Sequence, residues 1–256
     1  LAHPSRRWRG ALEVWPELFA ERAPRTSLNR PIGPDRRLAV VRGDLEVARQ
    51  VGHAHQAKVN DVVLAAVAGG LRQLLAGRGE DVQRLVPRAM VPISLHRERP
   101  GQASGNQDAV MVVPLPLGEP DPVRRLDLIG AETAARKRKA RPQIGSGIFG
   151  FVSVQRLWYR FLARQRTVNL VVTNVPGPPV PLYLAGARLL EVFPVVPLLG
   201  NISIGVGALS YAGQFNLTVV ADREACPDLD VFVQGARRSL DALADAVVGP
   251  PAGRTC

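Results

Sequence analysis

The fold is decided by one stretch near the carboxyl end of the chain, Gly200-Asn-Ile-Ser-Ile-Gly-Val-Gly-Ala-Leu-Ser-Tyr-Ala-Gly-Gln-Phe-Asn-Leu-Thr-Val-Val-Ala221. Apolar residues occupy every second position in two runs of it, at Ile202, Ile204, Val206 and Ala208 and again at Phe215, Leu217, Val219 and Ala221. A period of two is typical of a strand with one buried face. The tight turn at 211–214 joins the two runs, so the stretch predicts a β-hairpin with one face in a core.

The other face of the first strand carries Gly205 and Gly207. These glycines lie within a strand and not at a strand-to-helix turn, so they do not indicate a dinucleotide-binding loop. Glycines on one face of a strand let a ligand or another backbone come close. We therefore expect close approach over this face.

Further apolar runs indicate strands at 38–42, 85–95, 108–117, 168–173 and 188–193. Pro114 and Pro116 place the far end of 108–117 at a sheet edge, because proline cannot donate to a ladder. Helices are predicted from the N-cap Asp44, from Asn60-Asp61 to Gly77, over 121–141 and from Asp228 to 247, with shorter ones at 11–21 and within 142–166.

These elements follow one another without a strict strand–helix–strand rhythm. We expect an α/β fold of the two-layer α+β type, with a mixed, largely antiparallel sheet and helices mainly on one face. Residues 1–37 are interpreted as a linker or crossover segment, 38–248 as one subdomain and 249–256 as a disordered tail.

The composition narrows the function classes. The 256 residues are 46% hydrophobic, enough for a sizeable core. We find no apolar window of membrane-spanning length and no signal-peptide core after Leu1, and we expect the start to be cut from a longer protein. Cys226 and Cys256 are too few for a disulfide framework or a cysteine metal pair, which fits a reducing cytoplasm.

The formal net charge is +11 and comes almost entirely from arginine. It favours anionic partners such as acidic membranes or phosphorylated cofactors, or else a solvated basic surface. Nucleic acid is not expected, because aromatic residues are only 5% of the chain and the basic run 136–139 contains none.

The residues do not present a complete catalytic set. His53 and His55 are two positions apart on a predicted helix and point to different faces, while His3 and His96 lie in a terminal segment and a polar loop. Neither a G-x-S-x-G elbow nor a phosphate-binding P-loop occurs, and we predict no metal site.

Three features are less ordinary, and each also has a plain structural explanation. Asn60-Asp61 begins a helix, where Asn60 would serve as a cap; Thr173-Asn174 ends a strand in a stiff turn; and Asn201 opens the hairpin. Together they place short polar side chains at the ends of elements, where binding sites often gather.

In this order the motifs resemble a known family. The resemblance rests on Asn60-Asp61, Gly105-Asn106-Gln107, Thr173-Asn174-Val-Pro-Gly177-Pro and Gly200-Asn201-Ile-Ser203-Ile-Gly-Val-Gly, with Thr26-Ser-Leu-Asn29 and Arg36-Arg37 as the crossover linker. It covers about residues 26–248 and is to the C-terminal region of bacterial wax ester synthase/diacylglycerol acyltransferases. The resemblance implies a CoA-dependent acyltransferase fold, in which two similar α/β subdomains meet along a tunnel.

The resemblance also implies a chemistry. In this family a motif H-H-x-x-x-D-G in the N-terminal subdomain carries the general base, which activates an alcohol for attack on the thioester of acyl-CoA. No such pair occurs here, and His53-Ala-His55 with Asp61 has the wrong spacing. The chain is therefore expected to be the C-terminal half of an enzyme that makes triacylglycerol or wax esters, inactive alone.

The site residues that the resemblance implies are supporting ones. Asn60 and Asp61 would hold the active-site architecture, and the tunnel would be lined by Asn106, Thr173, Asn174, Gly177, Asn201 and Ser203. Acyl-CoA is expected as co-substrate, with no covalent cofactor.

The implied partners are the N-terminal acyltransferase subdomain, a lipid alcohol and an anionic membrane or lipid-inclusion surface met from the cytoplasm. An apolar patch is expected along the side that carries Asn60 and the strand 201–211. Two alternatives stay open: a non-catalytic lipid-binding or regulatory domain of the same fold, and an unrelated basic module that binds nucleic acid.

Overall fold

A computed structural model describes residues 21–94, 108–139 and 163–249. Its main sheet has six strands in the order β1-β8-β7-β4-β2-β3. The strands are β1 (Arg36–Asp44), β2 (Arg88–Ser94), β3 (Asp108–Pro114), β4 (Leu170–Pro176), β7 (Ile204–Tyr211) and β8 (Gln214–Asp222). β4 runs parallel to β2 and β7 while the other neighbours are antiparallel, so the predicted mixed, largely antiparallel sheet is confirmed.

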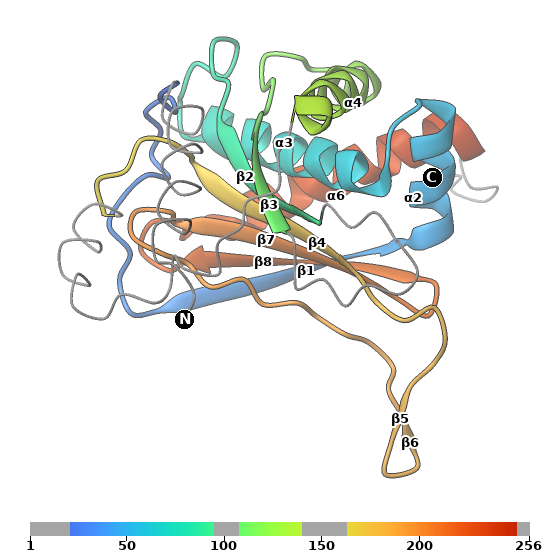
Figure 1. Cartoon of the computed structure of the whole chain (residues 1–256). Helices are drawn as coiled ribbons and strands as arrows, with labels where there is room; N and C mark the ends of the chain where they lie inside the picture. Colours follow the sequence, from blue (N-terminus) through green and yellow to red (C-terminus); the bar gives the residue numbers. More distant parts are fainter. Residues whose placement is uncertain (1–20, 95–107, 140–162, 250–256) are drawn as a thin grey trace, which may run out of the picture.

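Four helices cover one face of this sheet. They are α2 (Leu45–Ala54), α3 (Val59–Gly77), α4 (Pro122–Lys139) and α6 (Leu229–Val248), all above the sheet in Figure 1. The hairpin residues that face them, among them Val206 and Leu217, join the main hydrophobic core. The two-layer architecture expected from the sequence is therefore present.

Helix α3 lies at the centre of the helix layer and packs most extensively against α6. The two backbones approach closely, since a Cβ added at Gly235 would lie 2.8 Å from the Gly69 carbonyl oxygen. By length and composition α3 could also cross a membrane, but 72% of its apolar window is buried inside the fold. Its apolar character is thus explained by its place in the core.

Local signals account for the hairpin and for the start of α2. Ala212 and Gly213 both have positive φ, 46° and 86°, as a two-residue hairpin turn requires. The Asp44 carboxylate accepts the backbone N–H groups of Glu46 and Val47 at 2.7 and 3.1 Å, which confirms the predicted N-cap. Strand β3 lies at the sheet edge, as Pro114 and Pro116 predicted.

The strand predicted at 188–193 is wrong. Only two short strands form here, β5 (Tyr183–Leu184) and β6 (Ala187–Arg188), and they pair with each other in a separate hairpin. The hairpin belongs to an arm, residues 178–199, that projects from the sheet face opposite the helices (Figure 1). The apolar run does not join the main sheet, and the segment that follows it packs across the face of β7 at Gly205 and Gly207 instead.

Several predictions lie outside the described residues. They are the helix at 11–21 except its last residue, His96, the loop 97–107 with Asn106, most of the helical stretch 142–166, and the tail beyond 249.

Candidate functional site

Asp61 links the first turn of α3 to α4. Its carboxylate accepts the Lys58 backbone N–H at 2.8 Å and the Thr133 hydroxyl at 2.7 Å, and the residue is 5% exposed. The N-cap of α3 is therefore Lys58, and the side chain that bonds its backbone is Asp61 and not the half-buried Asn60. With two donors already on it, this carboxylate positions two helices and is not a free base.

Basic residues surround this carboxylate. Lys137 lies close to Lys58 and Asp61, and burial, followed by the charge of Lys58, lowers the pKa of Lys137. Asp61 opposes that shift. The first turn of α3 is thus a locally cationic position held around one buried carboxylate.

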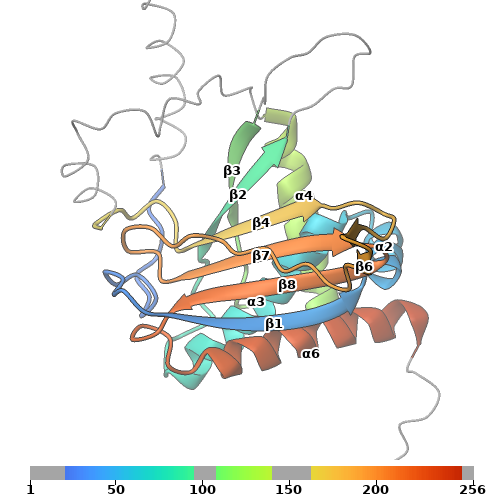
Figure 2. The same cartoon turned by 90° about the horizontal axis from the view of Figure 1, so that it is seen from below.

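The carboxyl end of β4 lies at the same end of the molecule as the first turn of α3 (Figures 1 and 2). By register, Thr173 is opposite Gly207 and Asn174 opposite Ala208, so Asn174 shares the face that the helices cover. A Cβ at Gly177 would fall 2.2 Å from the Ser210 carbonyl oxygen, which explains the glycine after Pro176. The first turn of α3, with Asn60 and Asp61, and the carboxyl end of β4, with Asn174 and Gly177, therefore lie at the same end of the molecule. Thr173 faces the opposite side of the sheet from Asn174.

The glycine face of β7 is covered by the chain itself. A Cβ at Gly207 would meet Pro194 and Val196 at 3.1 Å, and one at Gly205 would meet Leu198 at 3.2 Å. The expected close approach is thus made by the return segment of the arm, and not by a ligand. Figure 2 shows this segment crossing the sheet face that the helices leave open.

Asn201 and Ser203 lie at the other end of β7. Ser203 and Ala208 are separated by about 17 Å at roughly 3.3 Å per strand residue. The Ser203 hydroxyl donates to the Leu28 carbonyl oxygen, and both Ser203 and Asn201 are buried. The structure therefore does not bring them together with Asn174.

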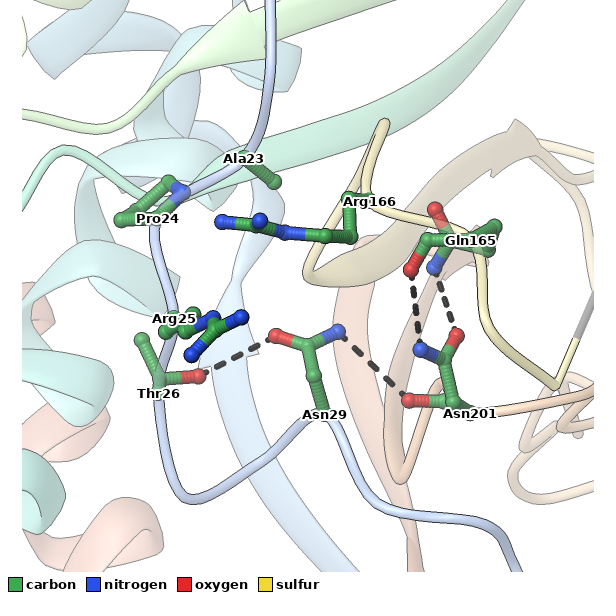
Figure 3. A pocket seen from close by; sticks show the side chains of 8 residues that line it. All are labelled: Ala23, Pro24, Arg25, Thr26, Asn29, Gln165, Arg166 and Asn201. Carbon is green, nitrogen blue, oxygen red and sulfur yellow. Dashed lines mark hydrogen bonds between the residues drawn. The ribbon is translucent and has the colours of Figure 1, made fainter.

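Asn201 forms one wall of a small pocket of about 220 Å³. Its side-chain oxygen accepts from the Gln165 side chain at 2.8 Å, and its side-chain nitrogen donates to the Gln165 backbone carbonyl at 2.9 Å (Figure 3). The backbone carbonyl oxygen of Asn201 accepts from the Asn29 side chain at 3.5 Å. Arg25 and Arg166 complete the lining as exposed cations. The amides of this pocket are engaged with one another, so only the two guanidinium groups remain to meet an anion.

Sequence reasoning missed most of this pocket. Thr26 and Asn29 carried a signal, because they belong to the linker motif, and Asn29 also accepts from Asn169 at 2.6 Å. Gln165 and Arg166 carried none, since their role depends on a segment that returns from far along the chain. The same holds for Thr133, the partner of Asp61.

Acid–base and metal-binding groups are sparse in the part of the chain that the structure describes. His55 Nδ1 lies 3.0 Å from an Asp127 carboxylate oxygen, an arrangement that links the end of α2 to α4. Within the described ranges no three His, Cys, Asp or Glu side chains are grouped to hold a metal ion.

The chain matches two family models in order. Residues 13–63 match the wax ester synthase/diacylglycerol acyltransferase catalytic domain, and residues 104–244 match the WS/DGAT C-terminal domain. In the structure both matches contribute to one sheet, because β1 pairs with β8.

Relatives of known name give the same result. A diacylglycerol O-acyltransferase (tgs1) of Mycobacterium tuberculosis is 30% identical over 244 residues, which are 92% of this chain and 52% of the relative. The O-acyltransferase WSD of Acinetobacter baylyi is 27% identical over 211 residues, covering 80% of this chain and 45% of WSD. This chain thus spans about half the length of the curated relatives that it matches.

Solved structures share the fold. The wax ester synthase/diacylglycerol acyltransferase of Marinobacter aquaeolei VT8 superposes with a TM-score of 0.69 at 24% identity, over 98% of this chain and 58% of that one. The starter condensation domain of rhizomide synthetase, solved in complex with C8-CoA and Leu-SNAC, superposes with a TM-score of 0.55 at 16% identity, over 95% of this chain and 53% of that one. Because the C-terminal domain model matches more than half of the residues of this chain, the chain belongs to the wax ester synthase/diacylglycerol acyltransferase family.

Proposed function

We propose that this chain forms the C-terminal half of an acyl-CoA-dependent O-acyltransferase that makes triacylglycerol, wax esters or both. One observation carries the proposal: the catalytic-domain and C-terminal-domain matches run in order through a single sheet, in a chain about half as long as its relatives. The described residues offer supporting groups around Asp61 and β4 and no complete catalytic set.

In the proposed reaction the base lies in the preceding subdomain, on the motif H-H-x-x-x-D-G. It removes the proton of the alcohol hydroxyl, and the oxygen attacks the thioester carbon of acyl-CoA. The carbon–sulfur bond then breaks and the CoA thiolate takes up the proton. Acyl-CoA serves as co-substrate and no covalent cofactor takes part. Asn60 and Asp61 support the site, while Thr173, Asn174 and Gly177 line the tunnel.

This proposal gives different roles to Asn201 and Ser203 on the one hand and Asn106 on the other. Asn201 and Ser203 are buried at the far end of β7 and are bonded to the chain's own groups, so we assign them to holding the linker 21–35 against the sheet. Asn106 lies outside the described residues and keeps its proposed place in the tunnel lining.

The arm is the proposed contact with the N-terminal subdomain. The sequence predicts an apolar patch along the side that carries Asn60 and the strand 201–211. Exposed large apolar side chains gather on the arm, whose return segment packs on that strand: Val180, Leu182, Tyr183, Leu184, Leu189, Leu190, Phe193, Val195 and Leu199. Leu184 is 81% exposed and Leu190 is 70% exposed. A concentration of exposed apolar side chains on one segment is typical of a protein interface.

The base of the arm is fixed to the sheet, which suits a contact surface. The Tyr211 hydroxyl accepts the Leu182 N–H at 2.7 Å and donates to the Leu189 carbonyl at 3.0 Å. Arg42 on β1 binds the Glu191 carboxylate through two nitrogens at 2.6 and 3.1 Å and lies 5.4 Å from the Phe193 ring centroid. The arm therefore presents its apolar tip from an anchored base.

The test is to co-express the chain with an N-terminal half that carries H-H-x-x-x-D-G and to follow transfer from labelled acyl-CoA to diacylglycerol and to hexadecanol. Ester is expected only when both halves are present, and not when the second histidine of the motif is replaced by alanine. A purified complex of the two halves that forms no ester from either alcohol would instead support the non-catalytic, lipid-binding or regulatory function.

We also propose that the assembled enzyme works in the cytoplasm at the surface of membranes or lipid inclusions. The last turns of α4 are basic, with Arg136 and Arg138 in its described part, and cations of this kind are attracted to anionic lipid. Flotation with anionic vesicles at low salt is expected to carry the protein to the lipid layer. Failure to float would exclude the membrane part of the proposal.

A further inference from the structure

Arg125 is a buried cation between three helices. It lies in the first turns of α4, is 2% exposed, and reaches the crossing of α3 and α6. The glycines of that crossing make room for it: a Cβ at Gly69 would fall 3.1 Å from Arg125 Nη2 and 2.7 Å from Ser239 Cβ. The guanidinium group thus occupies space that exists only because residue 69 has no side chain.

The hydrogen bonds of this guanidinium are incomplete within the described structure. Nη1 donates to the Glu119 carbonyl oxygen at 2.9 Å and Nη2 to the Ser239 hydroxyl at 3.0 Å. Nε is buried and has no partner among the described residues. A buried polar group of this kind normally has a partner, so the orphaned donor needs an explanation.

The charge is also uncompensated. Among the described residues, neither Arg125 nor its neighbours Arg72 and Arg238 have a carboxylate within ion-pair distance. Burial, followed by the charge of Arg72, lowers the pKa of Arg125, and this outweighs the opposing effect of Glu119 and Asp121. A buried charge without a counter-ion is costly, which favours an anion from outside.

The local carboxylates are engaged elsewhere. Glu119 accepts the Asp121 backbone N–H at 2.9 Å, while Asp121 accepts the Val123 N–H at 3.0 Å and lies 3.9 Å from Arg124. Neither side chain bonds Arg125, whose contact with Glu119 is through the backbone carbonyl.

The three arginines share one cleft of about 530 Å³ between α3, α4 and α6. Gln73 and Ser239 add neutral hydrogen-bonding groups to its lining. The volume falls within the range of about 300–1,000 Å³ typical of small-molecule sites. Arginine is well suited to phosphate oxygens, because its planar fork donates two parallel hydrogen bonds.

We infer that this cleft binds a phosphate group, with Arg72 and Arg238 at the entrance and Arg125 behind them. It is built from the helix layer, whereas the arm projects from the opposite face of the sheet (Figure 1). The inference therefore goes beyond the proposed acyl transfer and does not depend on it. The phosphate belongs either to a soluble phosphate ester or to a phospholipid head group.

The 256-residue chain can be titrated with pyrophosphate by calorimetry and with phosphatidylcholine vesicles with and without phosphatidic acid by flotation. Saturable binding is expected, weakened at least tenfold by Arg238→Gln and by Arg72→Gln. Arg237→Gln is the matched control, because it removes the same charge from an exposed neighbouring position on α6 outside the cleft.

The outcomes separate the sources and can overturn the inference. Site-dependent binding of pyrophosphate alone assigns a soluble ester, and site-dependent binding of phosphatidic acid vesicles alone assigns a lipid head group. Equal weakening by Arg237→Gln would reduce the effect to overall charge and overturn the site. Absence of binding in both titrations would overturn it as well. Neither readout requires catalysis, so failure of the acyltransferase proposal leaves this test unaffected.

Discussion

At the scale of single residues, Asp61 combines a helix cap with a link between helices, and Thr133 supplies one of its two donors. Replacing Thr133 by valine keeps the shape but leaves one buried carboxylate oxygen without its partner. We expect a loss of about 1–3 kcal/mol in the free energy of unfolding, measured in urea. Thr133→Ser keeps the hydroxyl and should lose only the contribution of the buried methyl group, about 0.8 kcal/mol. A loss confined to Thr133→Ser, with Thr133→Val as stable as wild type, would mean that the Thr133 methyl group, not the hydroxyl, stabilises this position.

Gly177 and Gly77 make a second pair at this scale. A Cβ at Gly177 would collide with the backbone oxygen of Ser210, whereas one at Gly77 would meet nothing within 4 Å. Gly177→Ala is therefore expected to lower the melting temperature clearly. Gly77→Ala, at the end of a helix, should raise the free energy of unfolding by about 0.4–1 kcal/mol, because alanine leaves the unfolded chain fewer conformations than glycine does. A Gly177→Ala variant as stable as wild type would contradict the close approach of β4 and β7.

The ion pair of Arg78 with Asp228 makes stability depend on pH. The hydrogen bond from Arg78 is the largest cause that holds the pKa of Asp228 below its ordinary value, and the pair is partly exposed. A carboxyl group whose pKa is lower in the folded than in the unfolded state stabilises the fold at pH values above the unfolded-state pKa, about 3.9 for aspartate. That contribution is lost as the pH falls from there through the pKa of the folded state. Urea unfolding at pH 6 and pH 3 should therefore differ less in Asp228→Asn than in wild type. Asp241→Asn, which removes an exposed carboxylate of α6, should leave the difference unchanged.

At the scale of elements, the arm is held on β7 by the absence of side chains at Gly205 and Gly207. Gly207→Val would push Pro194 and Val196 away from the sheet, and thermolysin is then expected to cut the arm faster than in wild type. Leu209→Val on the same strand face is the control, because it adds no bulk. Unchanged cleavage of Gly207→Val would show that the Arg42 and Tyr211 contacts suffice to hold the arm.

The elements also show what the sequence can predict. The N-cap at Asp44, the hairpin turn at Gly213 and the edge position of β3 depend on neighbours in the chain, so local patterns predicted them. The run at 188–193 has the apolar character of a strand, yet its place is set by contacts with residues far along the chain, such as Arg42 with Glu191 and Tyr211 with Leu189.

The candidate site divides in the same way. Asn174 and Asn201 both stand at the end of a strand, but only the parallel register of β4 and β7 reveals that those ends are opposite ones. The polar network around Asn201 depends on Gln165, which reaches it from another segment and has no local signature.

At the scale of the whole molecule, the chain presents opposite characters on its two sides. The helix layer carries a cleft with three arginines, and the opposite side carries the apolar arm. Nine large apolar side chains of the arm are exposed to water, and exposed apolar surface of this extent is typical of interaction sites. In the proposed function this surface would contact the N-terminal subdomain, and relatives about twice as long as this chain leave room for such a subdomain.

The apolar surface of the arm can be tested by replacing Leu184 and Leu190 together with aspartate. Because both side chains are largely exposed, the stability of the isolated chain should change by no more than about 0.5 kcal/mol per site. Burying a leucine at an interface contributes about 1.5–3 kcal/mol, so association with an N-terminal half should weaken by well over tenfold. Leu128→Asp, at an exposed leucine of α4 in the helix layer, should leave association unchanged in the same binding measurement. If the double variant binds the N-terminal half as tightly as wild type, the arm is not the contact, and its apolar surface must serve another ligand, with lipid the first to try.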